Sequence, residues 1–78
     1  MKLRLYELLD SITIEGNILI RIWDDDAEDY SFEKHLDDLK DRDAWVYGYP
    51  VRYIYPIEDI IHNKRTASVV IELYNEED

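Results

Sequence analysis

ILIRIW, residues 18–23, is the strongest strand signal in this chain of 78 residues. Ile18, Ile20 and Ile22 alternate with other residues, and isoleucine is β-branched, which suits a pleated sheet. Asp24 follows at once, and aspartate is depleted in strands. The stretch therefore predicts a strand that ends at Asp24.

The segment before this strand has a helical period. Leu5, Leu8, Leu9 and Ile12 follow the i, i+3, i+4, i+7 spacing of one helical face. This spacing predicts a short helix over residues 2–10. A helix of this length is marginal in water by itself, so we expect it to pack against the sheet. The pattern leaves open whether residues 12–15 form a separate short strand or a lead-in to the next one.

The segment after the strand allows two interpretations. DDDAED, residues 24–29, is a polar turn. YSFEKH, residues 30–35, is either the second strand of a hairpin or the beginning of a helix capped by Ser31.

A helical period also runs through the residues that follow. Phe32, Leu36 and Leu39 share one helical face. This predicts a helix from about 31 to 43, and at least over 35–42, while residues 30–34 stay open between strand and helix.

The last third of the chain predicts two more strands. VRYIY at 51–55 is one, and Pro50 suits its start because proline cannot donate to the ladder. Pro56 with IEDII opens one helical turn in this interpretation. Residues 63–65 form a turn, SVVIELY at 68–74 is the last strand, and NEED at 75–78 is a frayed tail.

These elements give the order α-β-(β)-α-β-β in one small domain, residues 1–78. We expect an α+β fold, a mainly antiparallel sheet with helices on one face. The chain has no cysteine, so no disulfide reinforces it, and a core of aliphatic and aromatic residues must supply its stability.

The charge of the chain narrows its partners. Nine basic against nineteen acidic residues give a net charge of −10. Direct binding to nucleic acid or to an anionic membrane is disfavoured, because both need a basic surface. A basic partner is favoured, including a protein that itself binds nucleic acid. The sequence has neither an export signal nor an apolar run of about 18 residues, so we expect a cytoplasmic protein without a membrane span.

No pattern of catalytic residues is present in the sequence. His35 and His62 are the two histidines, no serine lies in a nucleophile elbow, and Gly16 and Gly48 are too few for a phosphate loop. We therefore expect a protein that is not an enzyme and needs no cofactor.

The start of a calcium loop is also incomplete. Asp24, Asp26 and Glu28 alternate as its first ligands would, but Asp29 stands where glycine is needed and His35 where glutamate is needed. The sequence therefore predicts no dedicated metal site.

The negative charge is concentrated in residues 24–43, which hold ten acids against three bases. On the predicted helix Glu33, Asp37 and Asp41 would stack at i, i+4 spacing, which costs about 0.2–0.5 kcal/mol for each like-charge pair. One interpretation is a solvated face that keeps the protein soluble. The other is a surface that imitates phosphates and enters a basic groove. The candidate partner-binding acids are Asp24, Asp25, Asp26, Glu28, Asp29, Glu33, Asp37, Asp38 and Asp41.

The second candidate surface is aromatic. The odd positions from 45 to 55 are Trp45, Tyr47, Tyr49, Val51, Tyr53 and Tyr55. A bulge or bend near Gly48 or Pro50 is expected to break this alternation, while Tyr53 and Tyr55 share a face with Val51. Part of this row is expected in the core, and part in a protein contact or a homodimer, because tyrosine is enriched at interfaces. The candidate contact residues are Tyr47, Tyr49, Tyr53 and Tyr55.

The opening KLRLYELL, with Lys2, Leu3, Tyr6 and the Glu7-Leu8-Leu9 run, the acidic block and the α+β pattern resemble small acidic proteins of phages and mobile elements. Anti-CRISPR and anti-restriction proteins are the functional group of this kind. The resemblance implies inhibition of a nucleic-acid-binding defence complex. The alternative is a structural or adaptor module that associates with itself or with a host protein through its tyrosine-rich strand.

Overall fold

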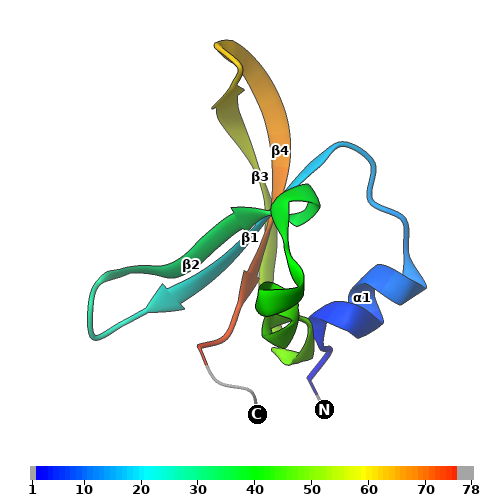
Figure 1. Ribbon diagram of the computed structural model, residues 1–78, viewed down its shortest axis with the longest axis vertical. Coiled ribbons are helices and arrows are strands. Elements are labelled where there is room, and N and C mark those ends of the chain that lie inside the picture. The colour runs from blue at the N-terminus through cyan, green and yellow to red at the C-terminus, as the bar shows by residue number, and fades with distance from the viewer. Residues whose placement is uncertain (1, 76–78) are drawn as a thin grey trace.

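A computed structural model describes residues 2–75 of the chain (Figure 1). It contains a short helix, α1 (Leu5–Ser11), and four strands: β1 (Asn17–Asp24), β2 (Asp29–His35), β3 (Val51–Ile61) and β4 (Lys64–Leu73). Two 3₁₀ segments, η1 (Leu36–Asp38) and η2 (Asp41–Gly48), connect β2 to β3. The strands form one mixed sheet in the order β2-β1-β4-β3, so the predicted α+β class is confirmed.

The sheet consists of two hairpins joined side by side. β1 pairs antiparallel with β2, and β3 pairs antiparallel with β4. Between the hairpins, β1 and β4 run parallel, with Ile20 opposite Ile71 and Ile22 opposite Leu73. Two of the three pairings are thus antiparallel, and β2 and β3 are the edge strands.

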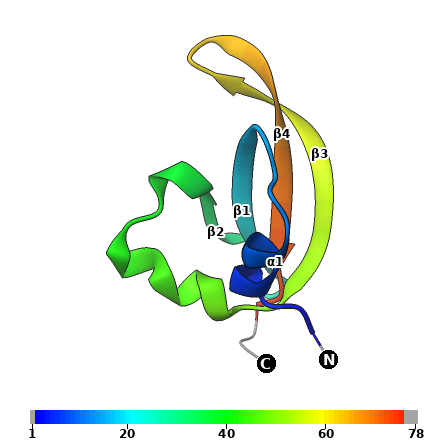
Figure 2. The ribbon, with the colours of Figure 1, turned by 90° about the vertical axis from the view of Figure 1, so that its right-hand side faces the viewer.

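The core lies on one face of this sheet, where α1 and η2 cover it (Figure 2). Leu5 and Leu8 of α1 and Val46 of η2 belong to the same buried cluster as Ile20 and Ile71. The predicted amphipathic pattern of the helix is therefore the reason why it packs here. The helix begins at Leu5 rather than at residue 2, and Ile12, predicted on its buried face, is extended and 50% exposed.

The helix predicted for 31–43, and at least for 35–42, is wrong. Residues 29–35 are a strand, which settles the open segment 30–34, and the residues beyond them form the two 3₁₀ segments. The strand is favoured because Phe32 pairs with Ile22 over the core, and Glu33 pairs with Arg21 on the opposite face. Opposite charges and apolar pairs across strands each stabilise a sheet.

The helical turn predicted after Pro56 is also wrong, because β3 continues to Ile61. Pro56 is accommodated because β3 is an edge strand, so the backbone groups on its outer edge have no neighbouring strand to bond. The turn lies at His62 and Asn63, both with positive φ, one position before the predicted one. Residues 12–15 are not a strand, and residues 76–78 of the predicted tail lie outside the described residues.

Candidate partner-binding surface

The turn between β1 and β2 carries the first group of exposed acids. The Oδ1 atom of Asp24 accepts hydrogen bonds from the backbone N–H groups of Asp26, at 3.0 Å, and of Ala27, at 3.3 Å. This local bonding is the way in which aspartate stabilises a turn. Asp24 is half-buried, whereas Asp25, Asp26, Glu28 and Asp29 are exposed. We call these four exposed residues the acidic tip.

Two carboxylates of the acidic tip are held in place by local bonds. Trp23 Nε1 donates to Asp25 Oδ1 at 2.8 Å, and the Tyr30 N–H donates to Asp29 Oδ1 at 2.7 Å. In the part of the chain that the structure describes, no lysine, arginine or histidine forms an ion pair with any residue of the tip. Within the described residues the tip therefore has no salt bridge, although Arg52 lies near enough to Asp25 for an electrostatic attraction.

A second group of exposed acids lies at the opposite end of β2. Asp37 and Asp38 belong to η1, and Asp41 begins η2. All three are exposed, and across residues 2–75 none of them forms an ion pair. They do not stack along a helix, as the sequence predicted, because the chain is not helical there. We call them the acidic shoulder.

Glu33 and Asp43 belong to the acidic block but are engaged inside the fold. Glu33 pairs with the Arg21 guanidinium across β1 and β2. Asp43 is 6% exposed, and its Oδ2 accepts from Lys34 Nζ and from the Lys40 N–H, each at 3.0 Å. The Lys40 N–H first, and then the Lys34 ammonium, hold the pKa of Asp43 below its usual range. These two carboxylates stabilise the fold and reduce the surface available to a partner.

The tyrosine row is divided between core and surface. Tyr47 and Tyr49 are half-buried and pack against the core cluster. Trp45 lies edge-on to Phe32, with ring centroids 5.4 Å apart, and to Tyr49, at 5.2 Å. These contacts favour the core interpretation for Tyr47 and Tyr49 over the contact surface.

A bulge changes the positions of the remaining tyrosines. The register of β3 shifts between Val51 and Tyr53, so Val51 pairs with Leu73 in the core whereas Tyr53 pairs with Glu72 on the opposite face. The prediction that Val51 shares a face with Tyr53 and Tyr55 is therefore wrong. Tyr53 is 53% exposed, and the Arg52 guanidinium lies 4.9 Å from the centre of its ring. Among the four candidate tyrosines, Tyr53 alone presents most of its ring to solvent.

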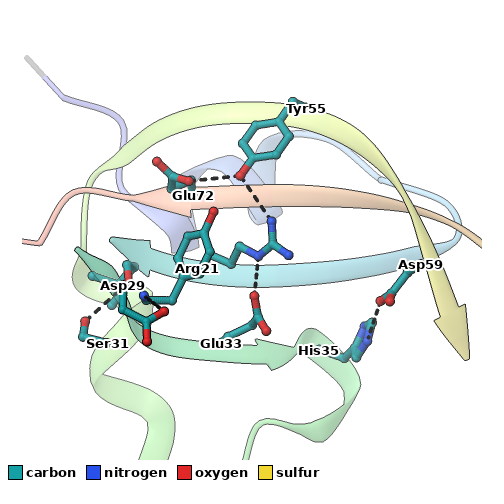
Figure 3. Close-up of polar contacts among 10 residues, drawn as sticks. Arg21, Asp29, Ser31, Glu33, His35, Tyr55, Asp59 and Glu72 are labelled. Atoms are coloured by element: carbon teal, nitrogen blue, oxygen red, sulfur yellow. Dashed lines mark hydrogen bonds and ion pairs between the residues drawn. The ribbon is translucent and has the colours of Figure 1, made fainter. Parts of the chain in front are cut away.

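Tyr55 belongs to a polar row that crosses the face opposite α1 (Figure 3). Its hydroxyl donates to Glu72 Oε1 at 3.0 Å and accepts from Arg21 Nη1 at 3.4 Å. Burial is the main cause that raises the pKa of Tyr55 to about 12, and the Glu72 carboxylate adds to it. Arg21 also binds Glu33, so one row of side chains joins all four strands.

On the same face, side chains of the two edge strands contact each other. His35 Nε2 of β2 lies 3.5 Å from Asp59 Oδ2 of β3 (Figure 3). Edge strands three spacings apart would be about 14 Å apart in a flat sheet. The sheet must therefore curl toward this face. Sequence reasoning missed this row because it needs the parallel register of β1 and β4, for which the sequence carries no local signal.

Two clefts lie near the acidic groups. One, of about 470 Å³, is beside the acidic tip and is lined by Trp23, Arg52 and Tyr74 together with Asp24, Asp25 and Asp26. The other, of about 210 Å³, is beside the acidic shoulder and is lined by His35 and His62. Within residues 2–75, no group of three or more histidine or acidic side chains is arranged to hold a metal ion.

The described helices are also too short and too polar to cross a membrane. Comparisons with protein-family models, with curated proteins and with solved structures find no match.

Proposed function

We propose that this protein is a non-catalytic acidic inhibitor of a basic partner in the cytoplasm, and that it occupies the surface on which the partner binds nucleic acid. The observation that supports this most is the position of the acidic tip and the acidic shoulder at opposite ends of β2. Seven exposed carboxylates without an ion pair in the described chain belong to these two groups.

The spacing of the two groups agrees with the geometry of nucleic acid. β2 has seven residues, so its ends are about 20 Å apart. One nucleic-acid strand carries one phosphate for each 3.4 Å of helix axis, or about six over this length. Seven carboxylates over the same length supply a comparable charge. They are gathered at the two ends, so the best partner has two basic patches about 20 Å apart.

The rigidity of the supporting elements favours binding over a purely solubilising role. The acidic tip is held by backbone bonds to Asp24, and the acidic shoulder follows a strand paired with β1. Carboxylates held in this way lose little freedom on binding, and their field also accelerates association with a basic surface. This is the role that the resemblance to anti-CRISPR and anti-restriction proteins implies.

The test is affinity capture with wild-type protein and two charge variants. Asp37→Lys with Asp38→Lys reverses two of the three charges of the shoulder. Asp10→Lys with Glu15→Lys is the control, because both pairs are exposed and change the net charge equally. The proposal expects capture of nucleic-acid-binding proteins that added nucleic acid displaces. We expect the shoulder variant to bind them about tenfold more weakly than the control variant does.

Equal binding by the shoulder and control variants, both folded by circular dichroism, would show that net charge alone governs capture. Captured proteins that nucleic acid does not displace would also contradict the proposal. Reversing Asp26 and Glu28 of the acidic tip tests the second patch in the same way.

A further inference from the structure

The β3–β4 hairpin differs in charge from the rest of the molecule. Residues 51–73 contain three bases and three acids, so they are neutral in a chain of net charge −10. Two copies of such a chain repel each other wherever their acidic groups meet. This hairpin is the part at which two copies approach with the least repulsion.

One face of the hairpin is also mostly apolar and uncovered. Cross-strand partners share a face, so Ile54, opposite Ile71, and Pro56, opposite Val69, lie on the side of α1. Ile60 follows on the same side. Ile54 is 49% exposed and Ile60 is 72% exposed, although both are large and apolar. The turn end of the hairpin extends past Asn17, the first residue of β1, away from α1 and η2 (Figures 1 and 2). We define the outer hairpin face as Ile54, Pro56, Ile60, Ala67 and Val69.

Two charged side chains lie on this same face, because Glu58 pairs with Ala67 and Arg65 pairs with Ile60, and both are loosely held. Glu58 Oε1 and Arg65 Nη1 are 3.7 Å apart, and their side chains are 65% and 80% exposed. Exposed pairs of this kind contribute little within one molecule. An antiparallel two-fold arrangement of two hairpins would place Glu58 of one copy against Arg65 of the other. The face is therefore complementary to itself in both apolar surface and charge.

We propose that the outer hairpin face binds a second copy of the chain, in a weak two-fold dimer. The contact is made by side chains and not by pairing of the β3 edges, because Pro56 lacks the N–H that a continuous ladder would require. This inference goes beyond the proposed function. It leaves the acidic tip and the acidic shoulder free, so a dimer would present two copies of each to a partner.

Sedimentation velocity from about 1 μM to about 1 mM tests this proposal, since a small interface gives a weak dimer. Wild-type protein is expected to shift from monomer to dimer in this range. Ile54→Glu should weaken the dimer at least tenfold. Ile12→Glu is the matched control, because Ile12 is 50% exposed against 49% for Ile54 and lies outside the face. Monomeric wild-type protein at every concentration, or equal weakening by both variants, would overturn the proposal.

A charge exchange tests the two-fold arrangement. Arg65→Glu alone places like charges opposite each other and should weaken the dimer. Arg65→Glu combined with Glu58→Arg should restore it, since the pair across the interface is re-formed in the opposite sense. Failure of the double variant to restore the dimer would contradict this geometry. Glu58 and Arg65 belong to neither the acidic tip nor the acidic shoulder, so the result of this experiment is independent of the capture experiment.

Discussion

The β1–β2 hairpin and the β3–β4 hairpin form two halves of one sheet with different surfaces. The first carries the acidic tip at its turn and the acidic shoulder at its other end. The second is neutral overall and exposes Ile54 and Ile60. The difference shows how a small acidic domain can separate two kinds of contact. One half concentrates exposed negative charge, while the other half has no net charge and exposes large apolar side chains.

The two hairpins are joined by the apolar core between β1 and β4. Ile71 is fully buried and Ile60 is 72% exposed, so the two positions on one hairpin should respond very differently. Ile71→Ala should lower the free energy of unfolding by about 2–5 kcal/mol, and Ile60→Ala by less than about 0.5 kcal/mol. Urea denaturation measures both. Ile71→Val, with an expected loss of about 0.5–1.5 kcal/mol, serves if the alanine variant does not fold. Equal losses at the two positions would contradict the described core.

The polar row that crosses both hairpins is the second place to test their connection. Tyr55→Phe removes the hydrogen bond to the buried Glu72 carboxylate, which should cost about 1–3 kcal/mol. Tyr6→Phe, at an exposed position of α1, is the control and should cost little. An unchanged urea midpoint for Tyr55→Phe would mean that the row does not help to join the hairpins.

The same residue gives a pH dependence. The pKa of Tyr55 is raised from 10.0 to about 12, so the folded state favours the neutral phenol. Its stabilisation is therefore complete below pH 10 and is lost as the pH rises from about 10 toward 12. The wild-type urea midpoint should fall over this range, and the fall should be smaller for Tyr55→Phe. The same slope in both proteins would assign the alkaline loss to other groups.

Substitutions at Asp43 and Asp41 of η2 test which acidic side chains stabilise the fold. Its pKa is lowered in the folded state by the Lys40 N–H and the Lys34 ammonium, so its contribution is present above its unfolded pKa and is lost as the pH falls through the folded value. Asp43→Asn should lower the thermal midpoint at pH 7 and make the loss of stability below pH 4 shallower. Asp41→Asn, two residues earlier on the exposed shoulder, should change neither. If the two variants lost stability with falling pH in the same way, Asp43 would not differ from Asp41 in its contribution to the fold.

The two hairpin turns offer the smallest effect. His62 and Asn63 have φ of 52° and 64°, and Glu28 has φ of 51°. Asn-Gly is the preferred pair for such a two-residue turn, so His62→Asn with Asn63→Gly should stabilise by about 0.5–1 kcal/mol. Glu28→Gly should do the same for the acidic turn. Glu58→Gly, in the middle of β3, is the control and should destabilise, because glycine weakens a strand.

The parts of the fold that sequence predicted well are those with one dominant local pattern. ILIRIW alternates over six residues, and β1 contains all of it. YSFEKH satisfied both periods at once, because Phe32 fits either a strand or a helical face. Its pairing with β1 decided between them, and pairing is not visible in the local sequence. Pro56 misled for a related reason: proline is favoured in the first turn of a helix and disfavoured in a central strand, but it is tolerated on an edge strand.

The candidate surface was predicted in part. Composition located the acidic block, because charge needs no knowledge of the fold. Which carboxylates face solvent depends on partners brought from other elements, such as Arg21 for Glu33 and Lys34 for Asp43. The prediction for the tyrosine row was wrong beyond the bulge. One extra residue at position 52 moves the side chains that follow it to the opposite face of the sheet. The sequence did not predict the outer hairpin face, because Ile60 was assigned to a helical turn and not to a strand.

The parallel pairing at the centre of the sheet has a consequence for the way in which the chain folds. Asn17 and Ser68 are paired although 51 positions separate them, whereas each hairpin closes through a short turn. Hairpins form in microseconds, while distant strands meet late because closing a long loop costs entropy. Until then the inner edges of β1 and β4 are unprotected and available to other chains. A net charge of −10 opposes the approach of such half-folded chains, so we expect the acidic residues to reduce aggregation before the parallel pairing forms.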